Sequence, residues 1–162
     1  MSFESKGAYV SKLTNPIMRD SRDVELLTLL VKRPRSTVSE LARHVGMSAP
    51  AVRERIQRLE KDGVIKRWSV EIDTKALGYQ VTAFVRIRPM AGKLTQIARL
   101  AERLPEVAEC YRITGEDCFI MRVHLKSLES MDELLDQFLA FGQTTTSIVQ
   151  SSIVEPRNVL LS

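Results

Sequence analysis

Residues 37–62 read TVSELARHVGMSAPAVRERIQRLEKD, and this stretch decides the fold of the N-terminal part of the chain. Thr37 and Glu40 form a capping box, in which each side chain satisfies an unpaired backbone N–H at the start of a helix. Gly46 supplies the positive φ with which many helices end, and Ser48 is a capping residue for a further helix. Two capped helices joined by a short turn that contains glycine predict a helix-turn-helix.

The second of these helices has a narrow apolar stripe and a wide polar surface. The stripe consists of Val52, Ile56 and Leu59, so most of the remaining side chains are expected to face outward. An α-helix fits the major groove of DNA, and its N-terminal residues contact base edges in this motif. Two basic residues just after the helix add possible phosphate contacts. The predicted DNA-contacting residues are Ser48, Pro50, Ala51, Arg53, Glu54, Arg55, Gln57, Arg58, Lys61, Lys66 and Arg67.

The distribution of charge supports a nucleic-acid partner. The formal net charge of the 162 residues is +4. Residues 32–67 hold ten basic and four acidic side chains, a local charge of +6, whereas residues 76–162 hold nine basic and ten acidic ones. A basic block beside a near-neutral remainder is typical of a polyanion-binding module joined to a second module. The alternative is a solvated basic face on a simple three-helix unit; the turn, the caps and the charge together favour double-stranded DNA.

Four regions follow from the pattern along the chain. Residues 1–19 have no helical or strand period and are expected to form a flexible N-terminal arm. Residues 20–65 are expected to form the helix-turn-helix domain. Residues 66–78 are expected to form a linker strand, and residues 79–162 a second domain.

The first helix of the N-terminal domain is expected over residues 20–32. It stops before Pro34, because the residue that precedes a proline disfavours the helical conformation. Its apolar face is expected to consist of Val24, Leu27, Leu30 and Val31.

From Gly78 onward the apolar period becomes that of strands alternating with helices. Strands are expected at 81–88, 107–114, 118–125 and 144–154, and helices at 94–104 and from Ser127 to an end at Gly142. The order βαββαβ is that of a ferredoxin-like split βαβ unit. The whole chain is therefore predicted to be α+β, with an N-terminal helix-turn-helix (winged-helix-like) domain and a C-terminal ferredoxin-like domain.

The second domain is predicted to leave one sheet face uncovered. A sheet of this topology carries both helices on one face, and the other face is expected to present Phe84, Tyr111 and Ile113 or their neighbours. The domain has little else with which to cover apolar side chains. An uncovered apolar sheet face predicts a homodimer.

With these motifs in place, the chain resembles the Lrp/AsnC family, the feast/famine regulators of bacteria and archaea, over roughly residues 20–160. The N-terminal part of the resemblance lies in SELA (39–42), VGMS (45–48), VRERIQRLE (52–60), GVI (63–65) and ALG (76–78). The C-terminal part lies in Gly115-Glu116-Asp117, which resembles the G-x-x-D loop between the second and third strands of the family's regulatory (RAM, or AsnC-type) domain.

The resemblance implies a transcription regulator that dimerises through the ferredoxin-like domain, assembles into tetramers or octamers, and binds an amino acid or related small molecule between dimers. An amino acid needs an acceptor for its ammonium group, such as Asp117, and hydroxyl or backbone N–H donors for its carboxylate. Without the resemblance, the loop is simply a tight hairpin of common turn residues. The implied effector-binding residues are Gly115, Glu116, Asp117, Thr144, Thr145, Thr146 and Ser147.

Two other functions share parts of this pattern. The same architecture resembles sirohaem decarboxylases, in which His124 with Arg112 or Arg122 would bind tetrapyrrole carboxylates. The second of these functions is that of an architectural DNA-binding protein that responds to no effector. The chain has no glycine-rich phosphate loop, and His44 and His124 belong to no cysteine or carboxylate cluster. We therefore expect no catalytic residue, no metal site and no cofactor apart from the effector.

The composition also indicates the cellular compartment in which the protein is expected. Cys110 and Cys118 are too few for a disulfide scaffold and lack the spacing of metal ligands. No run approaches the ~18 apolar residues of a membrane span, and the first residues lack the apolar segment of a signal peptide. A cytoplasmic protein without a membrane partner is expected.

Overall fold

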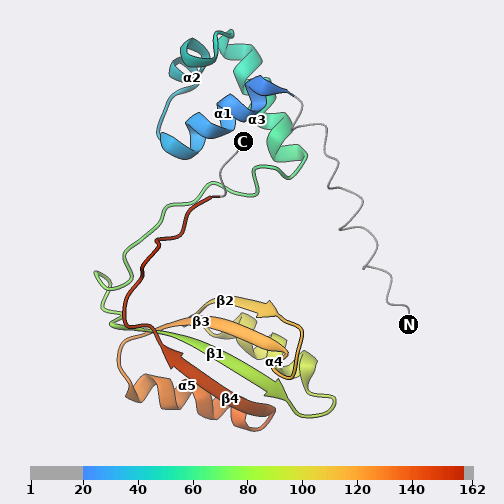
Figure 1. The fold of residues 1–162 in the computed structure, drawn as a ribbon, viewed down its shortest axis with the longest axis vertical. Helices are drawn as coiled ribbons and strands as arrows, with labels where there is room; N and C mark the ends of the chain where they lie inside the picture. The colour runs from blue at the N-terminus through green and yellow to red at the C-terminus, as the bar shows by residue number, and fades with distance from the viewer. Residues whose placement is uncertain (1–19, 159–162) are drawn as a thin grey trace. The chain divides into compact units, whose positions relative to one another are not determined.

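The computed structural model describes residues 20–158, which divide into two compact units with the boundary between Ser69 and Val70; the second unit ends at Glu155. The first unit contains three helices, and the second has the order βαββαβ (Figure 1). The α+β prediction, with a helix-turn-helix followed by a ferredoxin-like domain, is confirmed. The predicted N-terminal arm, residues 1–19, lies outside the described residues.

Helix α1, Ser21–Lys32, begins at Asp20, whose side chain accepts a hydrogen bond from the backbone N–H of Arg22 (3.0 Å). The helix ends at Lys32, as the following proline requires. Its buried face differs from the expected one. Leu26 and Leu30 are buried together with Asp23, whereas Val31 is half exposed. The prediction was right for Leu30, and Leu27 packs against the core, but it placed Val31 on the buried face and missed Leu26 and Asp23, which is buried in ion pairs.

The capping box predicted at the start of helix α2, Val38–Val45, is present. The backbone N–H of Thr37 donates to Oε2 of Glu40 (2.7 Å), and the backbone N–H of Glu40 donates to Oγ1 of Thr37 (3.3 Å). Gly46 ends the helix with a φ of 63°, a value that few residues other than glycine adopt. The helix-turn-helix geometry therefore arises from local signals in the sequence.

Helix α3, Ala49–Lys61, begins at Ser48, whose Oγ accepts from the backbone N–H of Ala51 (3.4 Å). The apolar stripes of the three helices meet in one small core. Its fully or nearly fully buried members are Leu26, Leu30, Leu41, Ala42, Val45, Val52 and Leu59. Because α3 uses only a narrow stripe for this core, the rest of its surface remains exposed.

The predicted linker strand at 66–78 is wrong. Residues 66–73 form no strand, and residues 74–78 form a turn. The alternation of Trp68, Val70 and Ile72 suggested a strand, but a strand needs a neighbour for its backbone N–H and C=O groups. These residues pair with no strand in the described part of the chain.

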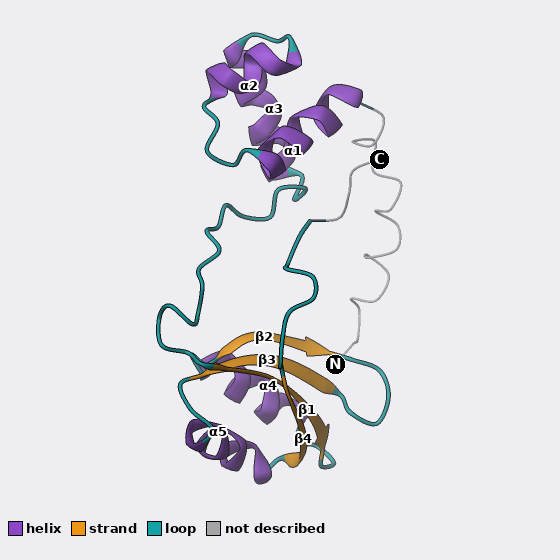
Figure 2. Ribbon diagram, turned by 60° about the vertical axis from the view of Figure 1, so that its left-hand side comes forward, coloured by secondary structure: helices purple, strands orange, loops and turns teal. Residues whose placement is uncertain are grey.

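The second unit is a four-stranded antiparallel sheet with the strand order β2-β3-β1-β4. Figure 2 shows both of its helices on the same face of the sheet. The core between sheet and helices includes Val85 and Ile87 of β1, Phe119 and Met121 of β3, and Phe138 of α5. Its elements are β1 (Val81–Pro89), α4 (Leu94–Arg103), β2 (Val107–Arg112), β3 (Phe119–Leu125), α5 (Glu129–Leu139) and β4 (Gly142–Ile148).

The end of the second unit differs from the prediction in two respects. Helix α5 ends at Leu139, and Gly142 is the first residue of β4 rather than the end of the helix. A Cβ at Gly142 would lie 2.5 Å from the backbone oxygen of Arg88, so this close approach requires glycine. The strand also stops at Ile148 instead of residue 154, because its neighbour β1 begins at Val81 and offers little further backbone to pair with.

The open face of the sheet carries the aromatic residues that the alternation predicted. Phe84 is 40% exposed and Tyr111 is 55% exposed, whereas Ile113 is half-buried. Arginine side chains at Arg86 and Arg88 lie on the same face of β1 as Phe84. The open face is thus a mixture of aromatic and charged side chains, with no helix of the second unit over it (Figure 2).

Candidate nucleic-acid interface and effector loop

Helix α3 presents a continuous polar surface. Arg53, Glu54, Gln57 and Lys61 are exposed, as predicted from the narrow apolar stripe. At the start of the helix, Ser48 and Pro50 are exposed and Ala51 is half-buried. No ion pair in the described part of the chain involves Arg53 or Lys61. This surface therefore offers two unpaired cations and several hydrogen-bonding groups.

Two other arginines of α3 are held by carboxylates of the first helix. Nη1 of Arg55 lies 2.6 Å from Oδ1 of Asp23, and Nη2 of Arg58 lies 2.6 Å from Oδ2 of the same carboxylate. Asp20 also pairs with Arg55. Asp23 is 1% exposed, and its charge is therefore compensated entirely by these arginines. The hydrogen bond from Arg55 keeps the pKa of Asp20 below the usual range of aspartate, and both aspartates raise the pKa of Arg55.

Lys66 and Arg67 follow the helix in an irregular segment and are exposed. The segment is connected to the helix by Trp68, whose indole Nε1 donates to Oε1 of Glu60 (2.6 Å). The two basic residues therefore lie within a few residues of the C-terminal end of α3. This arrangement is compatible with phosphate contacts beside the helix.

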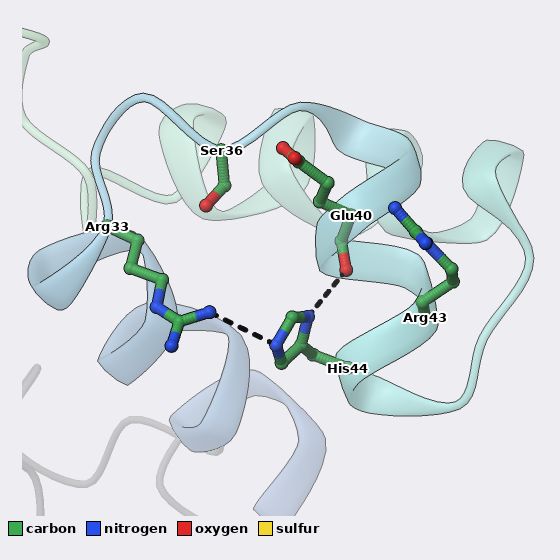
Figure 3. A pocket seen from close by; sticks show the side chains of 5 residues that line it. All are labelled: Arg33, Ser36, Glu40, Arg43 and His44. Atoms are coloured by element: carbon green, nitrogen blue, oxygen red, sulfur yellow. Dashed lines mark hydrogen bonds between the residues drawn. The ribbon is translucent and has the colours of Figure 1, made fainter.

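A second basic surface of the first unit was missed by the sequence analysis. It is an open pocket lined by Arg33, Ser36, Glu40, Arg43 and His44, between the end of α1 and α2 (Figure 3). Nδ1 of His44 lies 2.8 Å from the carbonyl oxygen of Glu40, which can only accept, so Nδ1 donates. Nε2 of His44 then accepts from Nη1 of Arg33 (3.2 Å). His44 thus links the Glu40 carbonyl group and the Arg33 guanidinium at this pocket, and only the fold brings Arg33 next to His44.

In the second unit, the loop between β2 and β3 is anchored on β1. The backbone N–H of Cys118 donates to the carbonyl oxygen of Ile87 (2.9 Å), and Gly115 has a φ of 112°. Nη1 of Arg86 lies 3.6 Å from Oδ2 of Asp117, and Arg88 forms an ion pair with Glu116. The sequence could not connect Arg86 and Arg88 to this loop, because that connection requires the strand register.

The spacing within this loop departs from the motif that it resembles. In G-x-x-D the aspartate is the third residue after the glycine, whereas here Asp117 is the second residue after Gly115. The third position is Cys118, which is half-buried. The loop therefore contains a carboxylate, that of Asp117, but it lies one position earlier than the aspartate of the motif.

The hydroxyl run of β4 is divided between the two faces of the sheet. Thr145 and Ser147 lie opposite Arg86 and Phe84 on the open face. Thr144 and Thr146 lie opposite Ile87 and Val85, on the face covered by the helices. Thr145 is thus brought beside the Arg86–Asp117 pair, whereas Thr144 and Thr146 point to the other side.

The residues considered for tetrapyrrole binding are likewise divided. Arg122 and His124 share the open face of β3; Arg122 is paired with Glu109 (2.6 Å), and Nδ1 of His124 lies 3.0 Å from Oγ1 of Thr82. The guanidinium of Arg112 instead lies 4.9 Å from the ring centroid of Phe119, which belongs to the helix-covered face. Burial, and then the charge of Arg122, lower the pKa of His124.

Neither a metal cluster nor a membrane-crossing helix was found in residues 20–158. No group of three or more histidine, cysteine, aspartate or glutamate side chains there is arranged to hold a metal ion. None of the helices in that range is long and apolar enough to cross a membrane.

Comparison with known proteins agrees with both halves of the structure. The profile of the winged helix-turn-helix DNA-binding domain matches residues 19–66, and that of the Lrp/AsnC ligand binding domain matches residues 82–159. The transcriptional regulator LrpC of Bacillus subtilis is 31% identical over 134 residues, which are 83% of this chain and 93% of LrpC. The regulator LrpA of Mycobacterium tuberculosis is 34% identical over 142 residues, 85% of this chain and 94% of LrpA.

Solved structures give the same result. The structure of B. subtilis LrpC has a TM-score of 0.79 at 30% identity and covers 85% of this chain and 98% of LrpC. The feast or famine regulatory protein Rv3291c of M. tuberculosis, solved in complex with L-methionine, has a TM-score of 0.81 at 30% identity, with coverage of 87% and 98%.

The fold and the matches together define a two-domain transcriptional regulator, with a DNA-binding domain followed by a ligand-binding domain. The chain belongs to the Lrp/AsnC family.

Proposed function

We propose that this chain is a sequence-specific DNA-binding regulator that responds to an amino acid or a related small molecule and acts as a homo-oligomer without catalytic activity. The observation that carries the DNA-binding part is the polar surface of α3, on which Arg53 and Lys61 have no ion-pair partner among residues 20–158, beside an ordered helix start at Ser48. Family membership supports the combination of a DNA-binding and a ligand-binding domain.

The proposed contacts to DNA divide into two kinds. Residues near the start of α3 and on its exposed face are assigned to base edges, because the N-terminal part of this helix enters the major groove. Cations at the border of that face and after the helix are assigned to phosphates. The base-edge set is Ser48, Pro50, Ala51, Arg53, Glu54 and Gln57, and the phosphate set is Arg58, Lys61, Lys66 and Arg67.

The proposed effector site is built around Asp117 and Arg86. Their side chains carry opposite charges 3.6 Å apart on the open face, and Thr145 lies opposite Arg86. An amino acid has the complementary pair of charges: its ammonium group fits Asp117, and its carboxylate fits Arg86 and a hydroxyl donor. The L-methionine complex of Rv3291c supports an amino acid as the class of ligand. Gly115 and Glu116 complete the site through the loop backbone and the Arg88 pair.

The proposed assembly is a dimer that associates further into tetramers or octamers. Phe84 and Tyr111 are exposed on a sheet face that no helix of the second unit covers. A second copy of the chain is the partner that would bury these rings. The absolute mass in solution, measured by light scattering with and without effector, tests this part.

The DNA-binding part is tested by selecting ligands from a pool of random duplexes and measuring affinity by filter binding. A selected duplex should be preferred over a shuffled one, and log K should fall with log salt by about 0.9 for each phosphate neutralised. A salt slope near zero would contradict the interface. Preference without any effector response would instead indicate an architectural protein.

The effector part is tested by a thermal-shift screen of the twenty amino acids. A ligand that binds the folded state raises the melting temperature by mass action. The enzymatic alternative is tested separately by adding sirohaem to the protein. An unchanged absorption spectrum and no release of carbon dioxide would remove that alternative.

A further inference from the structure

The most buried charge among residues 20–69 links two helices. Asp23 of α1 is 1% exposed, and both of its oxygens are occupied, Oδ1 by Arg55 and Oδ2 by Arg58, each at 2.6 Å. Arg55 has a second partner in Asp20. Asp23 of α1 and the N-cap residue Asp20 therefore meet two arginines of the helix that we propose contacts DNA.

This network specifies geometry that apolar packing alone does not. The packing of Leu26, Val52 and Leu59 in their common core is non-directional, and it tolerates small rotations of the helix. A guanidinium is planar, and its hydrogen bonds have a fixed direction. A shift by one residue turns an α-helix by ~100°, which would separate both Arg55 and Arg58 from Asp23. The apolar stripe selects the side of α3 that faces the core, and the two ion pairs add a directional constraint on the rotation of the helix.

Arg55 and Arg58 differ in exposure and in the number of carboxylates that they bind. The side chain of Arg55 is 22% exposed and is shared between two carboxylates. The side chain of Arg58 is 48% exposed, and Nη2 makes its one hydrogen bond within the described part of the chain, to Asp23. The remaining donors of Arg58 are available to a further acceptor.

We propose that Asp23 is a positioning residue of the DNA interface, which sets the rotation of α3 through Arg55 and directs the Arg58 guanidinium to a DNA phosphate. This inference rests on the proposed function. It assigns Arg55 to holding α3 in place, in contrast to the direct DNA contact expected from the sequence. It assigns Arg58 to a phosphate at the edge of the interface.

The first test compares Asp23→Asn with Glu25→Gln in the full chain. Both variants remove one negative charge from α1, but Glu25 is exposed and takes part in none of these ion pairs. General electrostatics predicts slightly tighter DNA binding for both. If Asp23 positions α3, Asp23→Asn should instead lower affinity for the selected duplex roughly tenfold and change affinity for a shuffled duplex much less. Glu25→Gln should keep the wild-type ratio of the two affinities.

The second test uses a variant that keeps every charge. Arg58→Lys cannot both bond Asp23 and present a planar fork to a phosphate. We expect the slope of log K against log salt to be smaller than in the wild type by about 0.9 for each subunit on the DNA, the value of one phosphate contact per subunit. In the Asp23→Asn background the same substitution should have little further effect, because Arg58 has already lost its orientation.

All affinities are measured at a temperature at which circular dichroism shows the variant folded. If Asp23→Asn binds both duplexes as Glu25→Gln does, the positioning role is wrong. If Asp23→Asn does not fold, Arg58→Lys decides alone, and an unchanged slope overturns the proposal. Should the wild-type chain itself fail to discriminate between duplexes, the proposed function fails, and that result is distinct from either of these.

Discussion

Both units of this protein pair arginines with carboxylates, but they do so in opposite environments. In the first unit, Asp23 is 1% exposed and receives Arg55 and Arg58 in short, direct contacts. In the second unit, the Asp117 side chain is 27% exposed and lies 3.6 Å from Arg86, whose side chain is 46% exposed. The first arrangement is suited to fixing a structure, and the second to exchanging partners.

The physical basis of the difference is the energy of an unpaired charge. A buried carboxylate that loses its partner keeps the cost of desolvation, so the pair persists. A partly exposed carboxylate such as Asp117 that loses its partner is still reached by water, so the exchange costs less. A ligand with an ammonium and a carboxylate group can therefore replace the contacts of Asp117 and Arg86, whereas nothing of that kind enters the site around Asp23.

The largest expected effect is on stability. Asp23→Ala should reduce the free energy of unfolding of the first unit by about 2 to 3 kcal/mol, somewhat less than for a fully buried pair because both arginines reach solvent. Asp117→Ala should cost less than about 1 kcal/mol. Urea denaturation followed by circular dichroism measures both. Equal costs would remove the contrast between the two sites.

The next effect concerns the effector. Asp117→Ala removes the proposed acceptor for the ammonium group, and the contact between two charged groups should be worth roughly 1.5 to 3 kcal/mol. We expect the affinity for an amino acid found in the thermal-shift screen to fall by at least tenfold in calorimetry. DNA affinity without effector should stay at the wild-type value. A retained response would show that the effector binds elsewhere.

A smaller effect should separate the two faces of β4. Thr145→Ala removes a hydroxyl on the open face beside Arg86 and should weaken effector binding by about 0.5 to 1.5 kcal/mol. Thr146→Ala is the matched control, because that hydroxyl lies on the helix-covered face. If both substitutions weaken binding equally, the effector does not lie on the open face.

The smallest expected effect is a difference in pH response. The pKa of His124 is lowered by burial, so the folded second unit binds this proton less readily than the unfolded chain does. Its stability should therefore decline as the pH falls below about 6.5. In the first unit, the lowered pKa values of Asp20 and Glu40 give stability that is lost only below about pH 4.

Hydrogen exchange at pH 7.5 and 5.5 resolves this difference by unit. We expect amides of the second unit to lose protection against opening at the lower pH, while those of the first unit do not. His124→Gln should abolish the change, since glutamine does not titrate. A loss of protection confined to the first unit would contradict the assignment.

Features set by neighbouring residues could be predicted from the sequence. The capping box at Thr37, the turn at Gly46 and the alternation in β1 each need only a few adjacent residues, and all three are present. The exposed side of α3 followed from its narrow apolar stripe. In the same way, the βαββαβ order of elements along the second unit was predicted from the apolar periods and is present.

Features that depend on partners distant in the sequence could not be predicted. The segments at 66–73 and 149–154 have strand-like composition, but they have no neighbouring strand in the described part of the chain. The burial of Asp23 needed knowledge that two arginines of α3 lie opposite it. One signal was available: Asp23 stands three residues before Leu26 and therefore on the same face of the helix as the core residues.

The hydrogen bond between Trp68 and Glu60 has a practical consequence. Trp68 is the single tryptophan of the chain, it is 53% exposed, and its indole N–H is bound to α3. Because emission from an indole depends on its hydrogen bonding and on nearby groups, the protein carries its own optical reporter next to the end of its proposed recognition helix. Changes at that helix can thus be followed in real time on the unlabelled, unmodified protein.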